Sequence, residues 1–373
     1  MNLELFHPLL IGIPVFVVLL GPLMLLHELG HFLVARKVGI RVEEFGLGLP
    51  PRAVCLFKYG DTEYTINWLP IGAFVRMIGE EDPSHPQGFA AQTKCSRLAV
   101  LLAGPFMNLA FGFALLIIAY LAFATQPTAF RYQVVTVQPN SPAEALGLQP
   151  NDEIIAVNGK LLDSSTDPKV APLRSIALQS AGKPFTVEVL RSQTESLTPQ
   201  RLVLSTVLPH TLDSQAPLGV SLSLRVVAST HQPYSLSEAL LATFRDFIFI
   251  VTSMIRFPFD VISQRIALEH IRPVGPIGIT SIGVAMLEER QTQGLFPFIR
   301  FAGLISILVG FTNLLPIPPL DGGRALFIII EALHGRRIHP RYERRINSVS
   351  LMILVSLSVA IMVLDIVAPV NMR

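Results

Sequence analysis

The sequence predicts a polytopic α-helical membrane protein with about four transmembrane helices, a membrane-associated β-hairpin and one inserted β-rich domain. Composition, long apolar segments and one polar stretch of alternating residues lead to this fold class. Of the 373 residues, 51% are hydrophobic and only 15% are charged, whereas charged residues make up about 25% of an ordinary soluble domain. The formal net charge is only +2, so the charge balance predicts no nucleic-acid partner.

Four segments approach the roughly 20 apolar residues that a membrane-spanning helix needs. They run over residues 9–35, 98–124, 295–315 and 349–367. A further apolar segment, residues 235–259, is interrupted by Arg245, Asp246 and Arg256. These charges favour a helix that lies in the membrane interface, with a fifth span as the alternative.

A polar segment of different character lies between the second and third spans. Its alternating runs "YQVVTVQP", "DEIIAVNG", "PFTVEVLR" and "QRLVLSTV" predict strands, with a turn at Asn158-Gly159. "SPAEALGL" predicts a short helix that Ser141 caps, with Pro142 at its first position. We therefore expect a compact β-rich domain over residues 128–227.

Basic residues predict which loops face the cytoplasm, because short loops rich in Lys and Arg stay on that side. The loop between spans one and two and the loop between spans three and four both carry such residues. The two termini and the β-rich domain are then expected on the opposite side. Cys55 and Cys95 fall on the reducing side, which argues against a disulfide between them. Residues 1–8 carry Glu4 and no basic n-region, so we expect no cleaved signal peptide.

These expectations divide the chain into parts. The first part is a membrane core of helices 1 and 2 over residues 1–127, which includes a membrane-dipping hairpin at 39–80. The β-rich domain follows at 128–227, and an interfacial helical segment follows at 228–294. The last part, residues 295–373, is a membrane core of helices 3 and 4.

The pentapeptide "HELGH" at residues 27–31, where the first apolar segment ends, predicts a metal site. His27 and His31 are four residues apart, so on a helix they occupy one face and can bind one ion. Glu28 can reach a water at that ion, which is the H-E-x-x-H arrangement of two zinc ligands and a general base. The alternative is a pair of interfacial histidines that cap a membrane helix. Ionisable groups at membrane depth favour the functional interpretation.

A catalytic zinc site needs a third protein ligand and an open position. In "NLLPIPPLDGGRALFIIIEALHG" (313–335) the prolines break the third span, and Asp321 after the break is the best candidate ligand. Its alternative role is to cap the following helix, and one carboxylate can do both. Asn313 is a candidate catalytic amide for a developing oxyanion or the substrate backbone. Alternatively, Asn313 satisfies carbonyl groups that the prolines leave free.

Together these two motifs resemble the site-2 protease family of intramembrane zinc metalloproteases. "LAGPFMN" (102–108) is similar to the family's Gly-x-x-x-Asn element on Gly104 and Asn108. "NWLPIGAFVRMIGE" (67–80) resembles part of its membrane-dipping hairpin, with Gly72-Ala73 where Gly-Gly is usual. "VGPIGI" (274–279) resembles a further family segment before core helix three.

The segment "PNSPAEALGLQPNDEIIAVNGKLL" resembles the PDZ domain that bacterial members carry. The resemblance therefore implies a PDZ domain over residues 128–227, outside the cytoplasm. This chain has Pro150-Asn151-Asp152 where Pro-Gly-Asp is usual. Asn tolerates left-handed geometry, so we expect the turn to survive.

The resemblance also implies a biological setting. It implies a multi-pass protein of the bacterial cytoplasmic (inner) membrane, with one catalytic Zn²⁺ near the cytoplasmic side. The implied substrates are transmembrane segments of single-span proteins, such as anti-sigma factors or remnant signal peptides, usually after a first cut. The PDZ domain is then a site for a peptide or a C-terminus.

An exposed hairpin edge could bind an unwound substrate strand by β-augmentation. Gly72, Ala73, Phe74 and Val75, together with Asn108, are accordingly candidate substrate-binding residues. The alternative role of the hairpin is to pack against the site and shield it.

Two other functions compete with proteolysis. The first is a catalytically inactive membrane scaffold whose PDZ domain binds partners, but the full set of His27, Glu28, His31 and Asp321 argues against it. The second is a metal transporter, because broken helices with intramembrane His and Asp occur there too. In a transporter, the Glu28 carboxylate next to the metal ligand His27 would have no function.

Overall fold

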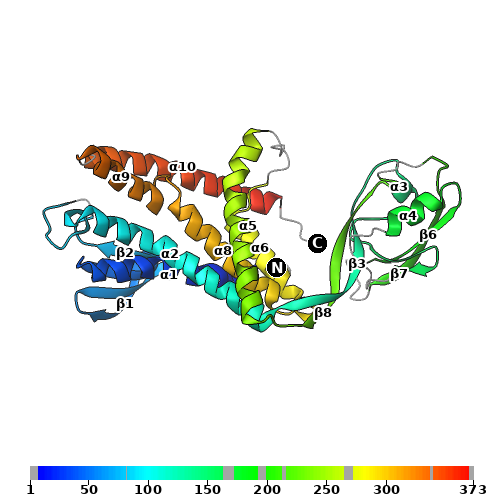
Figure 1. Cartoon of the computed structure of the whole chain (residues 1–373), viewed down its shortest axis with the longest axis horizontal. Coiled ribbons are helices and arrows are strands. Elements are labelled where there is room, and N and C mark those ends of the chain that lie inside the picture. The colour runs from blue at the N-terminus through cyan, green and yellow to red at the C-terminus, as the bar shows by residue number, and fades with distance from the viewer. Residues whose placement is uncertain are drawn as a thin grey trace. The chain divides into compact units, whose positions relative to one another are not determined.

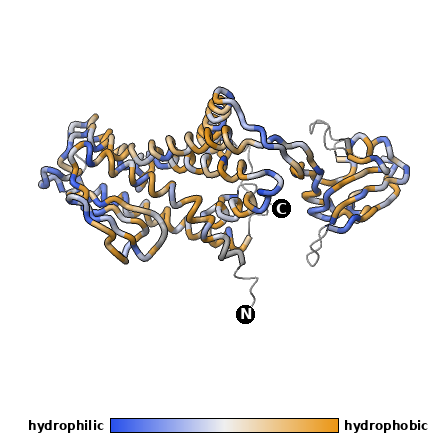
Figure 2. The backbone as a smooth tube through the Cα atoms, turned by 90° about the horizontal axis from the view of Figure 1, so that it is seen from below, coloured by the Kyte–Doolittle hydropathy of each residue, from blue (hydrophilic) through white to orange (hydrophobic). Residues whose placement is uncertain are grey.

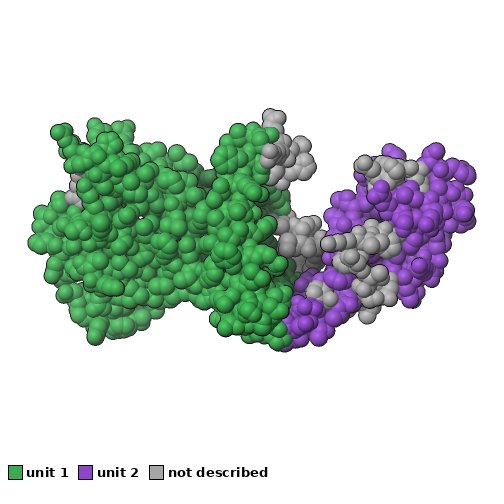
Figure 3. All heavy atoms as spheres, in the orientation of Figure 1, with its two compact units in different colours: residues 1–123, 233–288, 295–372 green, residues 124–232, 289–294, 373 purple. Residues whose placement is uncertain are grey.

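The computed structural model describes residues 7–80, 82–162, 172–191, 199–211, 216–263, 272–336 and 339–368. The expectation of no cleaved signal peptide rests on residues 1–8, and residues 1–6 lie outside this set. The chain forms two compact units (Figure 3). Unit 1 comprises Met1–Phe123, Pro233–Glu288 and Leu295–Met372, and unit 2 comprises Ala124–Gln232 with Glu289–Gly294.

Unit 1 is built mainly from long apolar helices (Figures 1 and 2). They are α1 (His7–Lys37), α2 (Lys94–Ile118), α5 (Leu236–Ile262), α6 (Pro276–Glu288), α8 (Phe296–Leu314), α9 (Asp321–His334) and α10 (Pro340–Val367). Within the described residues, four segments are long and apolar enough to cross a membrane, namely Gly12–Lys37, Lys94–Phe123, Phe296–Leu314 and Arg341–Val367. The chain is therefore a polytopic membrane protein, as the sequence predicts.

Local capping residues set several helix ends. Thr93 begins α2 by accepting a hydrogen bond from the backbone N–H of Ser96, and α2 continues as the π-helical turn η3 (Ala119–Phe123). Ser235 and Glu238 form a capping box that starts α5. The segment predicted to be interfacial thus forms a helix that ends at Ile262, and it is not among the four candidate spans.

One buried carboxylate attaches α5 to the helices around it. Asp246 accepts hydrogen bonds from two guanidinium nitrogens of Arg300 on α8, both at 2.8 Å, and from the Tyr120 hydroxyl, also at 2.8 Å. Burial raises the pKa of Asp246, but its bonds to Arg300 and Tyr120 outweigh burial, so that the pKa lies below its usual value. Asp246, one of the charged residues that interrupt this apolar helix, therefore holds α5 against α8.

The hairpin consists of two long strands, β1 (Val42–Tyr59) and β2 (Thr62–Met77), joined by a turn at Gly60 and Asp61. On one side, residues 44–47 of β1 pair with 63–66 of β2, and on the other side residues 42–47 pair with 73–77 of β2. Residues 62–67 pair in turn with 52–59. The sheet therefore has the segment 73–77 at one edge, because no other described strand pairs with it.

Glycines let the core helices approach closely. A Cβ atom on Gly30 of α1 would lie 2.5 Å from the carbonyl oxygen of Ala103 on α2, and one on Gly112 of α2 would lie 2.7 Å from that of Gly303 on α8. Both distances are too short for any side chain. Small residues at such contacts let helix backbones pack together within a membrane, so α1, α2 and α8 form one tightly packed group (Figure 1).

A buried ion pair fixes α9 to the start of α2. An Arg97 guanidinium nitrogen lies 2.9 Å from the Glu331 carboxylate, and the two side chains are only 9% and 13% exposed. Lys94 also donates to the backbone oxygen of Glu331, at 3.2 Å. Ala325 and Ile328 of α9 pack in a core cluster with residues of α1 and α2. The helix that begins at Asp321 is therefore held by both charge and apolar contact.

Unit 2 is a six-stranded sheet with the order β7-β6-β4-β3-β8, with β5 paired to β4. Its elements are β3 (Thr125–Val137), α3 (Pro142–Ala145), β4 (Glu153–Val157), β5 (Lys160–Leu161), α4 (Pro172–Gln179), β6 (Pro184–Arg191), β7 (Gln200–Val207), β8 (Val220–His231) and α7 (Arg290–Gln293). Ser141 caps α3 as predicted, and Asn151 takes the left-handed φ of 74° expected of it. The β-rich character is confirmed for the described strands. Its identity as a PDZ domain stays a prediction.

The buried pair of Arg97 and Glu331 gives a test of how α9 is held. Arg97→Ala removes the guanidinium group that pairs with the buried Glu331 carboxylate, so we expect the free energy of unfolding to fall by about 3–5 kcal/mol. Unfolding in detergent followed by circular dichroism measures the change. Lys58→Ala removes an exposed ion pair with Glu63 and should cost no more than about 1 kcal/mol. Equal losses in the two variants would contradict the assignment of Arg97 as an anchor.

Candidate metal centre

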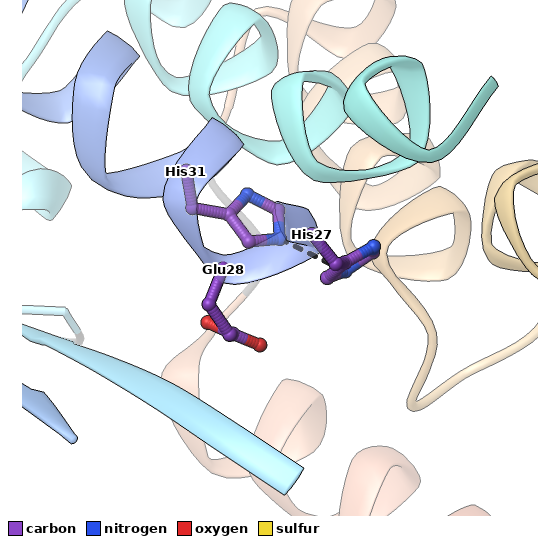
Figure 4. Close-up of side chains that lie close together, drawn as sticks. All are labelled: His27, Glu28 and His31. Carbon is purple, nitrogen blue, oxygen red and sulfur yellow. Dashed lines mark hydrogen bonds between the residues drawn. The ribbon is translucent and has the colours of Figure 1, made fainter. Parts of the chain in front are cut away.

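Two histidines of α1 bring their rings together on one helix face. The Nε2 atoms of His27 and His31 lie 3.2 Å apart, and Glu28 projects from the same part of the helix (Figure 4). The ligand atoms that these three side chains offer all lie within 4.8 Å of one another. The four-residue spacing read in the sequence thus places both imidazoles on one face, as the helical repeat requires.

Asp321, 294 residues further along the chain, completes a three-atom set. Its Oδ2 atom lies 3.0 Å from Nε2 of His27 and 3.4 Å from Nε2 of His31. Tetrahedral bonds of about 2.0–2.1 Å to Zn²⁺ put neighbouring ligand atoms about 3.3–3.4 Å apart. The observed separations of 3.0, 3.2 and 3.4 Å match this geometry closely. Two nitrogens and one carboxylate oxygen, converging without an intervening side chain, therefore fit a zinc ion.

The break after α8 delivers Asp321 to the histidines. The helix ends at Leu314, and α9 begins at Asp321 with Leu320 as its N-cap, which makes no side-chain capping bond. A Cβ atom on Gly323 would lie 2.5 Å from the backbone nitrogen of Pro318, so glycine is required where the chain folds back. The Asp321 carboxylate points to the histidines rather than taking the N-cap position. This placement favours the ligand role of Asp321, which stays a prediction beside the capping role in the first turn of α9.

One face of α2, which carries Val100, Gly104 and Asn108, packs against both imidazoles. The carbonyl oxygen of Val100 accepts a hydrogen bond from Nδ1 of His31 at 2.7 Å. A Cβ atom on Gly104 would lie 2.8 Å from Nε2 of His27 and closer still to Nε2 of His31. The amide of Asn108 lies 3.3 Å from Nδ1 of His27. The spacing of four residues puts all three on one face of α2, so this face determines how the rings turn and leaves room for them.

The edge of the hairpin sheet touches Glu28. The backbone N–H of Val75 faces the Glu28 carboxylate. Val75 belongs to the edge segment 73–77, and its neighbours Gly72, Ala73 and Phe74 precede it on the same strand. Successive residues of a strand direct their N–H groups to opposite sides. Since the N–H of Val75 points to Glu28, that of Ala73 also points away from β1.

One candidate catalytic residue makes a different contact. The amide of Asn313 donates to the carbonyl oxygen of Val309, one turn earlier in α8, at 3.1 Å. Pro316 removes the N–H group that would bond to Thr312, so the Val309 carbonyl is not one that the prolines leave free, and this contact is neither of the two roles predicted for Asn313. Among the described contacts, none joins Asn313 to the His27, His31 and Asp321 cluster.

Some of the neighbours of the metal centre are missed by sequence reasoning. The carbonyl oxygen of Val100 and the backbone N–H of Val75 belong to apolar residues, so no side-chain motif marks them. The signal that could have found Val100 is its place four residues before Gly104. The hairpin motif predicts Val75 as a substrate contact, but its place beside Glu28 follows only from which strand edge faces α1.

Comparison with known proteins agrees with this site. The family model "Peptidase family M50" matches residues 15–357. A protein of Clostridium perfringens named "Putative zinc metalloprotease" is 30% identical over 355 residues, which cover 93% of this chain and 96% of the relative. A Nostoc protein with the same descriptive name is 31% identical over 359 residues, 93% of each chain. "Zinc metalloprotease RasP" of Shouchella clausii is 27% identical over 433 residues, 93% of this chain and 96% of the relative.

The geometry at Asp321 predicts the effect of removing its carboxylate. We expect Asp321→Ala to weaken zinc binding by more than the roughly 10–100-fold that outer-shell substitutions cost, because one of three protein ligands is lost. Zinc content and competition with a chelator measure the change. Leu320→Ala alters the N-cap position beside it and should leave zinc bound. Full zinc occupancy in Asp321→Ala, with only a lower unfolding temperature, would return Asp321 to a capping role.

Proposed function

The chain belongs to peptidase family M50, the site-2 protease family, and from that premise we propose that this membrane metalloprotease cleaves transmembrane segments of single-span proteins. The observation that carries the proposal is the convergence of His27, His31 and Asp321 at 3.0–3.4 Å. A second observation is that Glu28 lies beside them, on a helix apolar enough to span a membrane. A peptidase whose metal ligands lie on such a helix has membrane segments within reach.

The depth of the site supports a membrane substrate. The basic end of α1 is formed by Arg36 and Lys37, which we expect at the cytoplasmic surface. His31 is six residues and His27 ten residues from that end, which corresponds to about 9 and 15 Å along the helix axis. The cleavage site is then expected in the cytoplasmic half of the membrane. The inner membrane of a bacterium is the compartment that we propose.

The residues divide the chemistry among them. His27, His31 and Asp321 would hold one Zn²⁺, which when bound activates water and polarises a carbonyl group. The Glu28 carboxylate takes a proton from the attacking water and later gives it to the nitrogen of the leaving amine. We propose that the Val75 backbone N–H, which faces this carboxylate, helps to orient it and leaves its other oxygen lone pairs free for the proton transfer.

The edge segment 73–77 supplies a place for the substrate. A helical peptide bond is shielded, so the substrate must unwind before hydrolysis, and an unwound strand needs partners for its backbone. The outward N–H of Ala73 lies two residues from Val75, whose N–H reaches Glu28. We propose that the substrate strand pairs at Ala73, which would direct its peptide bonds towards Glu28 by β-augmentation.

Unit 2 is proposed to act in substrate selection rather than in chemistry. The proposed ligands and the base all belong to unit 1. If unit 2 is a PDZ domain outside the cytoplasm, it would bind a peptide or a C-terminus, and it would limit cleavage to substrates whose outer domain a first protease has removed. Anti-sigma factors and remnant signal peptides are substrate classes of this kind.

Two alternatives explain less of the geometry. An inactive scaffold would need neither a carboxylate beside the histidines nor a backbone N–H that faces it. A metal transporter would use the histidines and Asp321 but would leave the contact between Val75 and Glu28 without a purpose. The family membership supports a hydrolase over both.

Glu28 provides the direct test of the chemistry. Glu28→Gln keeps size and hydrogen bonding but cannot accept the proton, so we expect zinc to stay bound and cleavage to fall by at least about 100-fold. The assay is cleavage of a model transmembrane substrate in liposomes. Glu43→Gln changes an exposed carboxylate on the adjacent hairpin and should leave the rate unchanged. Substantial cleavage by Glu28→Gln, at full zinc content, would remove Glu28 as the base.

A second test concerns the sheet edge. Ala73→Pro removes the outward N–H and should slow cleavage of a stable substrate helix strongly, while Ala73→Val keeps the N–H and should do much less. A substrate weakened by Gly or Pro near the cut needs less unwinding, since these residues cost about 1 and 3 kcal/mol in a helix, and it should partly rescue Ala73→Pro. Equal rates for the two variants, at equal zinc content, would leave the edge as packing alone.

A further inference from the structure

Asn108 is a buried polar residue whose hydrogen bonding is incomplete. Its side chain is fully buried within unit 1, at 0% exposure. Among the described residues the amide oxygen, Oδ1, has no hydrogen-bond partner, and the amide nitrogen, Nδ2, lies 3.3 Å from Nδ1 of His27. Burying an amide group without hydrogen-bond partners costs free energy, so this arrangement calls for a physical explanation.

The state of His27 determines which amide atom must face it. Its Nε2 atom faces Asp321 and His31, so as a metal ligand His27 uses the lone pair of Nε2. Nδ1 then carries the proton and is a donor. A donor at Nδ1 is incompatible with the amide nitrogen but compatible with the amide oxygen. Turning the amide by 180° exchanges the two atoms without changing its shape, and it gives Oδ1 the partner that it lacks.

We propose that Asn108 is a positioning residue for the metal centre, whose amide oxygen accepts a hydrogen bond from Nδ1–H of His27. The inference rests on the proposed function, in which His27 is a zinc ligand. The Val100 carbonyl oxygen does the same for His31, at 2.7 Å from its Nδ1. Both rings are then fixed in the tautomer that presents Nε2 to the ion, and both acceptors come from one face of α2.

The position of the amide is itself fixed by a neighbouring helix. The hydroxyl of Ser306 on α8 donates to the backbone carbonyl oxygen of Asn108 at 2.8 Å, in a fully buried contact. This bond holds α2 against α8 at the residue that faces His27. A buried amide held between three helices offers no free surface to a substrate, so the structure favours this role over the substrate contact considered from the sequence.

The test compares two substitutions of similar size in the full-length protein in detergent. Asn108→Leu fills the space without an acceptor, and we expect it to raise the zinc dissociation constant about 10–100-fold, the usual effect of losing such an acceptor. Asn108→Asp keeps an acceptor for Nδ1–H, so its zinc affinity should equal or exceed that of the wild type. Competition with a chelator measures both, and the absorption spectrum of the Co²⁺-loaded protein reports ligand geometry independently of activity.

Controls separate the positioning role from folding and from the ligand assignment. Ser306→Ala alters packing at the same contact but leaves the amide, and should keep zinc affinity close to the wild-type value. Asn108→Ala replaces the leucine variant if that variant does not fold. Wild-type affinity in Asn108→Leu, or equal losses in Asn108→Leu and Asn108→Asp, would overturn the proposal. Unchanged zinc binding in His27→Ala would instead show that the ligand set of the proposed function is wrong.

Discussion

The close contact between α1 and α2 is the constraint on which the metal centre depends. Gly30 on α1 leaves no room for a side chain against Ala103, and Gly104 on α2 leaves no room for one against the two imidazoles. At this separation, the backbone of Val100 and the amide of Asn108 reach the Nδ1 atoms of the histidines. A methyl group at Gly104 would occupy the space of the Nε2 atoms, where the ion has to bind.

Ionisable groups near a membrane interior need partners, and three places among the described residues show how the fold provides them. The His27, His31 and Asp321 cluster forms a site that a divalent cation fits. Arg97 and Glu331 pair with each other at the start of α2, and Asp246 pairs with Arg300. The last two pairs stabilise the helices around the site, while the first set has to stay available to the ion. The need for a partner explains why these buried charged residues of an apolar chain occur in clusters.

In the proposed function the hairpin sheet links the chemistry to substrate binding. It places one strand edge beside Glu28, so the N–H of Val75 that faces the base belongs to the same strand that offers an outward N–H at Ala73. A strand pairing there would be aligned with the base by the sheet itself. This arrangement gives a membrane protease a way to hold a peptide that has lost its helical hydrogen bonds.

Structural features that follow from local residue pattern can be predicted from the sequence alone. Apolar length marked the four spans, and alternating residues marked the strands of unit 2. The four-residue spacing marked His27 and His31, because helical geometry alone puts them on one face. The Asn151 and Ser141 positions followed from backbone preference and capping. Proline and charge in the segment 313–335 made Asp321 a candidate, but its capping alternative has the same local signature.

The tertiary structure favours the ligand role, because the distance between Asp321 and the histidines depends on how α8, α9, α1 and α2 pack. The Asn313 amide instead bonds within its own helix, to the carbonyl oxygen of Val309 one turn earlier. The packing also brought Val75 to Glu28 through the pairing order of the hairpin sheet. Backbone donors and acceptors such as Val75 and Val100 are present at every position, so no residue type distinguishes them, and their roles arise only where the fold places them.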